Sequence, residues 1–280
     1  MKNPEAQLPI GVFDSGIGGI SVLAEIIKLL PNEEFFYFAD TLHSPYGIKP
    51  ENIVRSLSIE AVKFLSLKGI KSLVVACNTA TSAAINEIRK MFTFPVIGME
   101  PAVKPAVELE RKGKILVMAT PLTLKSKKFH ELVRQYRRLA EIVPLPCAGL
   151  VEIIEQGHTH EQEVEDYLSH LFSSINQEEI STIVLGCTHY ILIKREIIKI
   201  FRRKINVIDG NYGTAKHLRT ILQKKCLLHD IRTDNPHVPL KANVRFYVSG
   251  NESEGITRCR QLLQDEGIVC ELESFYGNNT

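Results

Sequence analysis

The sequence predicts an α/β fold made of two pseudo-symmetric, doubly wound parallel-sheet domains with a ligand cleft between them. Short apolar runs alternate with helical patterns along the 280 residues, which is typical of parallel sheets wrapped by helices. The runs form two successive series of similar plan. In each series the third run ends in a cysteine, Cys77 or Cys187, that is followed by a small polar pair. A duplicated α/β unit would bring both strand ends to one cleft, where ligands of open sheets bind.

The first series provides the clearest elements. Each predicted strand is a short, nearly continuous apolar run, as expected for a parallel strand buried on both faces. Each predicted helix spans a longer segment in which apolar and polar residues recur with helical spacing. We expect strands at residues 9–13, 34–39, 72–76 and 95–98, and helices at residues 19–30, 50–67, 79–91 and 101–111.

The second series begins after residue 111, and the chain then continues into a tail. We expect strands at residues 115–119, 142–145, 182–185 and 207–208, then a helix at 212–224, a strand at 244–248, a helix and a short terminal strand. We expect this tail to return to the first domain. The first domain would therefore comprise residues 1–99 and 210–280, and the second residues 100–209. The polar, proline-containing segment 230–239 is the segment most expected to be a mobile loop.

The composition excludes several classes of protein. The 34 Lys and Arg residues against 32 Asp and Glu give a net charge of +2, which indicates neither a nucleic-acid nor a membrane partner. The locally basic segment 125–138 fits the solvated face of a helix. The N-terminus lacks the features of a signal peptide and no 18-residue apolar span follows, so we expect a cytoplasmic protein. The six cysteines form no C-x-x-C pair, which predicts reduced thiols rather than disulfides or zinc ligands.

The two strand-end cysteines are candidate reactive groups. A thiol at a helix N-terminus meets backbone N–H groups and the positive end of the helix dipole, which lower its pKa from about 8.5. This predicts unusually acidic thiols at Cys77 and Cys187, facing one substrate. For either cysteine alone, a buried thiol in the core is the simpler interpretation, because free cysteines are often buried.

Polar residues near other strand ends suggest what the cleft binds. The loop Asp14-Ser15-Gly16-Ile17-Gly18-Gly19 can turn tightly and point N–H groups at an anion, but it lacks the spacing of dinucleotide or phosphate loops. A small carboxylate is therefore the better guest, although Asp14 could simply cap a helix. Pro45-Tyr46-Gly47 forms a turn that could project amides and a phenol toward the cleft. Asn78 and Thr79, like Thr188 and His189, add donors beside each thiol.

In these motifs the chain resembles the glutamate racemases of the cofactor-independent aspartate/glutamate racemase superfamily. The resemblance covers nearly the whole chain, and its five short motifs occur in the order found in that family. They are Asp14-Ser15-Gly16-Ile17-Gly18-Gly19, Pro45-Tyr46-Gly47, Ala76-Cys77-Asn78-Thr79-Ala80, Met118-Ala119-Thr120 with Thr123, and Leu185-Gly186-Cys187-Thr188-His189-Tyr190. Ile191 replaces the usual proline, and Asp209-Gly210-Asn211 replaces a commoner turn, which puts only local loop geometry in doubt.

The resemblance implies an active site in the cleft and a reaction that interconverts L- and D-glutamate without cofactor or metal. Cys77 would take the proton from D-glutamate and Cys187 from L-glutamate, and Asp14, His189 and Glu152 would assist. The implied substrate contacts are Asp14, Ser15, Pro45, Tyr46, Gly47, Asn78, Thr79, Thr120, Thr123, Thr188 and His189. The resemblance also implies a homodimer that supplies D-glutamate for peptidoglycan.

Other functions stay open at this point. The substrate could be aspartate or a related amino acid, because sequence spacing does not measure pocket depth. Cys187 and His189 could form a thiol hydrolase, which would need one essential cysteine. Cys77, Cys187, His189 and Asp14 could instead bind a metal, which would make activity sensitive to chelators. A two-lobed amino-acid-binding protein is the non-enzymatic alternative.

Overall fold

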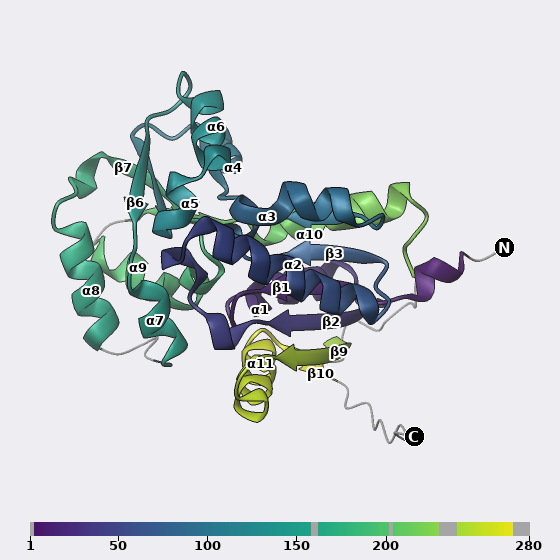
Figure 1. Cartoon of the computed structure of the whole chain (residues 1–280). Helices are drawn as coiled ribbons and strands as arrows, with labels where there is room; N and C mark the ends of the chain where they lie inside the picture. Colours follow the sequence, from purple (N-terminus) through teal and green to yellow (C-terminus); the bar gives the residue numbers. More distant parts are fainter. Residues whose placement is uncertain (1–2, 158–161, 202–203, 230–239, 271–280) are drawn as a thin grey trace.

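A computed structural model describes residues 3–157, 162–201, 204–229 and 240–270, and it contains two parallel sheets. The larger sheet has the strand order β10-β9-β2-β1-β3-β4, and we call it with its helices the six-stranded unit. Its strands are β1 (Ile10–Asp14), β2 (Glu34–Ala39), β3 (Ser72–Val75), β4 (Val96–Gly98), β9 (Leu240–Val248) and β10 (Ile268–Cys270). In Figure 1 the arrowheads of its strands point toward the second sheet.

The smaller sheet repeats the winding of the larger one. We call it with its helices the four-stranded unit, and its order is β6-β5-β7-β8. Its strands are β5 (Lys114–Ala119), β6 (Ile142–Pro146), β7 (Ile180–Leu185) and β8 (Asn206–Asp209). In both units the first strand lies between the second and third, and the fourth lies outside the third. The prediction of two doubly wound units on one plan is therefore confirmed.

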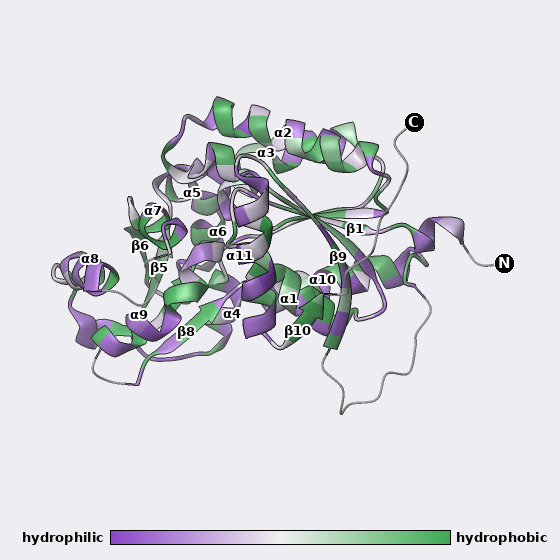
Figure 2. Ribbon diagram, turned by 90° about the horizontal axis from the view of Figure 1, so that it is seen from below, coloured by the Kyte–Doolittle hydropathy of each residue, from purple (hydrophilic) through white to green (hydrophobic). Residues whose placement is uncertain are grey.

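Helices cover both faces of the larger sheet. Apolar side chains of α1, α10 and α11 form a core on one face, and those of α2 and α3 form a core on the other. The bounds are α1 (Ile20–Leu29), α2 (Glu51–Leu67), α3 (Asn78–Met91), α10 (Asn211–Lys224) and α11 (Glu252–Asp265). In Figure 2 these ribbons alternate between hydrophobic and hydrophilic stretches, as expected for helices with one buried face.

The smaller sheet is covered in the same way. Residues of α7, α8 and α9 pack on one face, and residues of α4, α5 and α6 pack on the other. The bounds are α4 (Val103–Glu108), α5 (Pro121–Lys125), α6 (Lys127–Tyr136), α7 (Leu150–Glu155), α8 (Gln162–Phe172) and α9 (Lys194–Ile200). Short 3-10 helices are η1 (Pro4–Gln7), η2 (Thr41–His43), η3 (Tyr46–Ile48), η4 (Gln177–Glu179) and η5 (Thr188–Ile193).

The tail of the chain does return to the larger sheet, since β9 pairs with β2 and β10 pairs with β9. The exact domain limits, residues 1–99 with 210–280 and residues 100–209, stay a prediction. One predicted helix is shorter than expected, because α4 stops where the backbone of Glu110 enters the left-handed region at φ 48°. The expected mobile loop 230–239 lies outside the described residues. Among the helices that the structure describes, none is long and apolar enough to cross a membrane.

Candidate active site

The two cysteines occupy equivalent places at the ends of the third strands. β3 ends at Val75 and β7 at Leu185, and Cys77 and Cys187 directly precede α3 and η5. Both thiols are nearly buried, with 5% and 9% of their residue surface exposed. They lie near enough for the charge of Cys187 to raise the pKa of Cys77. The fold therefore brings together the two thiols that the sequence singled out.

Cys77 sits among hydroxyl, amide and carboxylate groups. Its Sγ lies 3.3 Å from Ser15 Oγ and accepts a hydrogen bond of 3.4 Å from the N–H of Ala80 in α3. Burial raises the pKa of Cys77 to about 12, and the negative charge of Asp14 acts in the same direction. The predicted acidic thiol is therefore wrong for Cys77, because the loss of hydration outweighs both hydrogen bonds at this helix start.

Cys187 has a different partner, the imidazole of His189. The Nδ1 atom of His189 lies 3.8 Å from Cys187 Sγ, and its Nε2 atom lies 2.5 Å from Glu155 Oε1. Burial alone would lower the pKa of His189, but its hydrogen bonds to Cys187 and Glu155 raise it well above the ordinary value. A positively charged imidazolium therefore stands beside the sulfur of Cys187 at neutral pH.

The acidic partner of this pair is Glu155, where the sequence suggested Glu152. Glu155 ends α7, and its Oε1 also accepts a hydrogen bond of 3.1 Å from the N–H of Ile17 in the six-stranded unit. Glu152 lies one turn earlier, where its charge acts on the phenol of Tyr167 in α8. The two acids stand three residues apart on one short helix, so no sequence signal separated them.

Glycines of the first loop allow the two units to approach closely. A Cβ atom on Gly18 would lie 2.6 Å from Nδ1 of His189, and one on Gly16 would clash with the carboxylate of Glu155. The hydroxyl of Tyr37 holds the loop by donating to the carbonyl of Gly16 at 2.8 Å. The predicted glycine turn exists, and Glu155 is a protein carboxylate that one of its N–H groups binds.

Asp14 connects the two halves of the site. Its Oδ1 accepts a hydrogen bond of 2.9 Å from the N–H of Gly16, and its Oδ2 accepts one of 3.2 Å from the hydroxyl of Thr188. The side chain is fully buried, and burial raises the pKa of Asp14 to about 6 against the opposing charge of His189. Asp14 therefore changes its charge at a slightly acidic pH, well above the range of an ordinary aspartate.

Three threonine hydroxyls join the units on the Cys77 side. Thr79 Oγ1 lies 2.9 Å from Thr120 Oγ1 and 3.2 Å from Thr123 Oγ1, and Thr120 donates to Thr123 at 2.9 Å. Beside them, a Cβ atom on Gly47 would lie only 2.5 Å from Thr120 Cβ. The substrate contacts predicted on these separate loops therefore meet in space.

The Pro45–Gly47 turn is held by Asp40, which the sequence analysis did not select. The phenol of Tyr46 donates to Asp40 Oδ2 at 2.6 Å, so its hydrogen is used within the protein. The same carboxylate is hydrogen-bonded to His43 Nδ1 at 2.9 Å and to Ser249 Oγ at 2.7 Å. Asp40 directly follows β2, so its place at a strand end was a signal that could have identified it.

Asn78 gives independent evidence for a ligand. It begins α3 directly after Cys77, and only 3% of it is exposed. Among the residues that the structure describes, neither its amide nitrogen nor its amide oxygen has a hydrogen-bond partner. A buried amide without partners is costly, so a bound molecule with both donors and acceptors fits this position.

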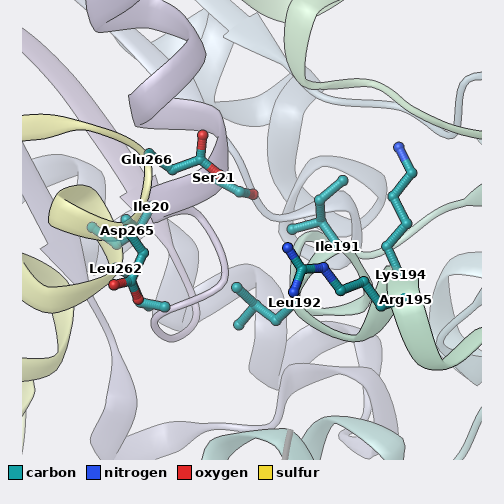
Figure 3. A pocket seen from close by; sticks show the side chains of 9 residues that line it. All are labelled: Ile20, Ser21, Ile191, Leu192, Lys194, Arg195, Leu262, Asp265 and Glu266. Carbon is teal, nitrogen blue, oxygen red and sulfur yellow. The ribbon is translucent and has the colours of Figure 1, made fainter. Parts of the chain in front are cut away.

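Two further features lie apart from this arrangement. In the described part of the chain, no three His, Cys, Asp or Glu side chains converge as a metal site would require. A cavity of about 390 Å³ lies between α1, α11 and the η5–α9 segment, and none of the predicted site residues lines it. Figure 3 shows its lining residues on the two sides of the gap.

Comparisons with known proteins show which proteins this chain resembles. The chain is 52% identical over 223 residues to a glutamate racemase from Clostridium novyi, covering 79% of this chain and 86% of the relative. Its structure is similar to a glutamate racemase isoform from Bacillus anthracis, with a TM-score of 0.82 and 31% identity over 96% and 98% of the chains.

A third comparison concerns a structure with a bound ligand. The glutamate racemase from Francisella tularensis, solved in complex with D-glutamate, matches with a TM-score of 0.79 and 29% identity over 98% and 100% of the chains. The sequence profile of the Asp/Glu/Hydantoin racemase family matches residues 18–218, which is well over half of the chain. On this evidence, the chain belongs to the Asp/Glu/hydantoin racemase family.

Proposed function

We propose that this protein is a glutamate racemase, which interconverts L- and D-glutamate by proton transfer between Cys77 and Cys187 without a cofactor. The observation that carries the proposal is the pair of buried thiols at equivalent strand ends of two similar units. Two acid/base groups on opposite faces of a substrate can remove and return an α-proton without moving the substrate. The glutamate racemases that resemble this chain support glutamate as the substrate.

The surroundings of the thiols suggest the starting protonation states. Cys77, buried and close to Asp14, begins as the thiol, since its pKa is raised to about 12. The proposal requires Cys187 to act as the base toward L-glutamate, and the imidazolium of His189, 3.8 Å from its sulfur, would be the counterion of the thiolate. The Cys187 thiolate would take the α-proton of L-glutamate, and the Cys77 thiol would donate its proton to the opposite face. The reaction from D-glutamate exchanges these roles.

The remaining polar groups have a binding role in this proposal. The amide of Asn78 and the hydroxyls of Thr79, Thr120, Thr123 and Thr188 would receive the carboxylate and ammonium groups of glutamate. Their support is the unpartnered amide of Asn78 and the convergence of the threonines from both units. Donors already fixed in a dry cleft stabilise the charge that develops as the α-proton leaves.

Asp14, His189 and Glu155 would control protonation. His189 contacts Cys187 directly, and Glu155 holds the other nitrogen of its ring. Asp14 raises the pKa of the Cys77 thiol through its negative charge. We therefore assign to Glu155 the assisting role that was expected for Glu152.

The test is racemisation of L-glutamate by the purified protein in D₂O without added cofactor. The expected result is loss of optical rotation with deuterium appearing at the α-carbon of D-glutamate, measured by NMR. The same assay with aspartate separates glutamate from the related substrate. Binding of glutamate without deuterium exchange would contradict the proposal and favour the amino-acid-binding alternative.

We further propose a cellular role from the family resemblance. The protein would act in the cytoplasm as a homodimer and supply D-glutamate for peptidoglycan. Sedimentation of the purified protein tests the dimer. Rescue of a D-glutamate-requiring bacterial strain by this chain, but not by its Cys77→Ser variant, tests the role in the cell wall.

A further inference from the structure

Glu155 stands at a position where its own helix gives it little support. It is the last residue of α7, a helix of only six residues. Its carboxylate nevertheless holds the ring of His189, whose Nε2 atom lies 2.5 Å from Oε1 of Glu155. A side chain that orients another group needs support of its own, because loose placement at a helix end spoils the contact.

That support comes from the other unit, through Arg258 of α11. Nη1 of Arg258 donates a hydrogen bond of 2.5 Å to the backbone carbonyl of Glu155. The positive charge of Arg258 also helps to lower the pKa of Glu155, although burial acts against this and the hydrogen bond from His189 contributes more. One arginine thus fixes the backbone of Glu155 and favours its anionic form.

The helix that carries Arg258 is firmly seated in the six-stranded unit. It packs on α1, β9 and β10. A Cβ atom on Gly255 would lie 2.5 Å from Cγ1 of Val248, so the helix lies tightly against β9. At its far end, Lys28 of α1 forms an ion pair of 2.7 Å with Glu266. Arg258 therefore extends from a helix that is held in place by its packing.

Beyond Arg258, α11 and the four-stranded unit are separated by a gap. Leu262, Asp265 and Glu266 line one side of the 390 Å³ cavity, and Leu192 and Arg195 are among the residues that line the other. Figure 3 shows this opening between the two sides. The bond from Arg258 to Glu155 thus links the two units at a place where the following turns of α11 face the four-stranded unit across this cavity.

We propose that Arg258 is a positioning residue, which holds Glu155 and through it keeps His189 against Cys187. The proposal deepens the proposed function and rests on it, since the effect on catalysis requires that Cys187 exchange a proton with the substrate. The titratable groups that interact with Glu155 and His189 are Asp14, Tyr37, Cys187 and Cys259. The groups that act on Cys77 are Asp14, Ser15, Ala80 and Cys187, which include neither Glu155 nor His189, so Arg258 should affect Cys187 more than Cys77.

The test compares the two thiols within one molecule. The substrate-free protein is treated with iodoacetamide at pH 7.5, and peptide mass spectrometry gives the alkylation rates of Cys187 and Cys77 in the same sample. For Arg258→Met we expect the rate at Cys187 to fall about threefold, the size of one partly exposed charge interaction, and the rate at Cys77 to change less. Arg258→Lys, which keeps the charge, should recover part of the rate.

Arg260→Met is the matched control, because it removes the same charge from an exposed position of the same helix. It should leave both rates unchanged. If the ratio of the Cys187 and Cys77 rates is unchanged in Arg258→Met, the proposal is overturned. This holds also if the substitution loosens the fold and both thiols react faster by the same factor. No glutamate is used in this experiment. It therefore tests the role of Arg258 even if the wild-type protein fails to exchange the α-proton of glutamate.

Discussion

The halves of the site around Cys77 and Cys187 share a fold but differ in chemistry. Both cysteines follow the third strand of a sheet with the same winding order. Cys77 precedes a 14-residue α-helix and accepts a hydrogen bond from its N–H group, whereas Cys187 precedes a 3-10 helix and contacts an imidazole. The duplicated fold therefore sets where the two thiols lie, while the neighbouring side chains give each thiol a different polar partner.

This difference has a consequence for a reaction between enantiomers. L- and D-glutamate have equal free energies, so kcat/KM must be equal in the two directions for any variant. Unequal surroundings of the thiols therefore cannot favour one product. They can change which proton transfer limits the rate, and isotope effects measured from each enantiomer report this.

The largest expected effect is the loss of either thiol. Cys77→Ser and Cys187→Ser should each lower racemisation more than ~10²-fold, the size expected when a positioned acid or base is removed. The loss should be the same from both enantiomers, measured by optical rotation. Cys226→Ser, at an exposed cysteine, is the control and should retain full activity. High activity in either active-site variant would break the comparison, since one thiol would then suffice.

A smaller loss is expected when Cys187 loses its counterion. His189→Asn removes the imidazolium 3.8 Å from the sulfur and should lower kcat/KM by roughly 10–100-fold. The primary isotope effect on kcat/KM should increase with α-deuterated L-glutamate, because the slower step at Cys187 then removes the deuterium. It should decrease with α-deuterated D-glutamate, because the slower step then follows the removal of the deuterium at Cys77. His217→Asn, on the exposed face of α10, is the control. Equal isotope effects from both enantiomers would contradict this assignment.

Asp14, on the Cys77 side of the site, should make the stability of the protein depend on pH. Burial raises the pKa of Asp14 from about 3.8 to about 6, so the fold favours its protonated form. Protonated Asp14 therefore adds to the free energy of unfolding. This contribution is fully present below the ordinary pKa of about 3.8, and it is lost as pH rises through the folded-state pKa of about 6. Relative to Asp14→Asn, the wild-type protein should lose roughly 1–2 kcal/mol of unfolding free energy between pH 5 and pH 8. Urea unfolding of both proteins at several pH values measures this difference. The same dependence of unfolding free energy on pH in both proteins would contradict the prediction.

The sequence predicted the strand ends well because buried parallel strands are continuous apolar runs that stop at polar residues. Cys77, Cys187, Asp14 and Asn78 were all identified in that way. Two kinds of information were less accessible. The pKa of Cys77 depends on burial by the whole fold, which outweighed the local helix start.

Contacts between units were the second gap. Glu155 and Arg258 lie far from His189 along the chain, and neither belongs to a motif. Glu155 is distinguished from Glu152 only by which of them reaches across to Ile17 and His189. Such choices depend on how the two units dock, and a pattern within one unit does not contain that information.

The smallest expected effect concerns Tyr46, which the family resemblance names as a substrate contact. Its phenol donates at 2.6 Å to Asp40, a buried carboxylate that also contacts Ser249. Tyr46→Phe should therefore change kcat/KM less than about threefold, while the unfolding free energy falls by about 1.5–3 kcal/mol, the range for a hydrogen bond to a charged group. Tyr212→Phe, at an exposed tyrosine, is the control and should change neither quantity. A tenfold rise in KM with unchanged stability would show instead that the phenol binds glutamate.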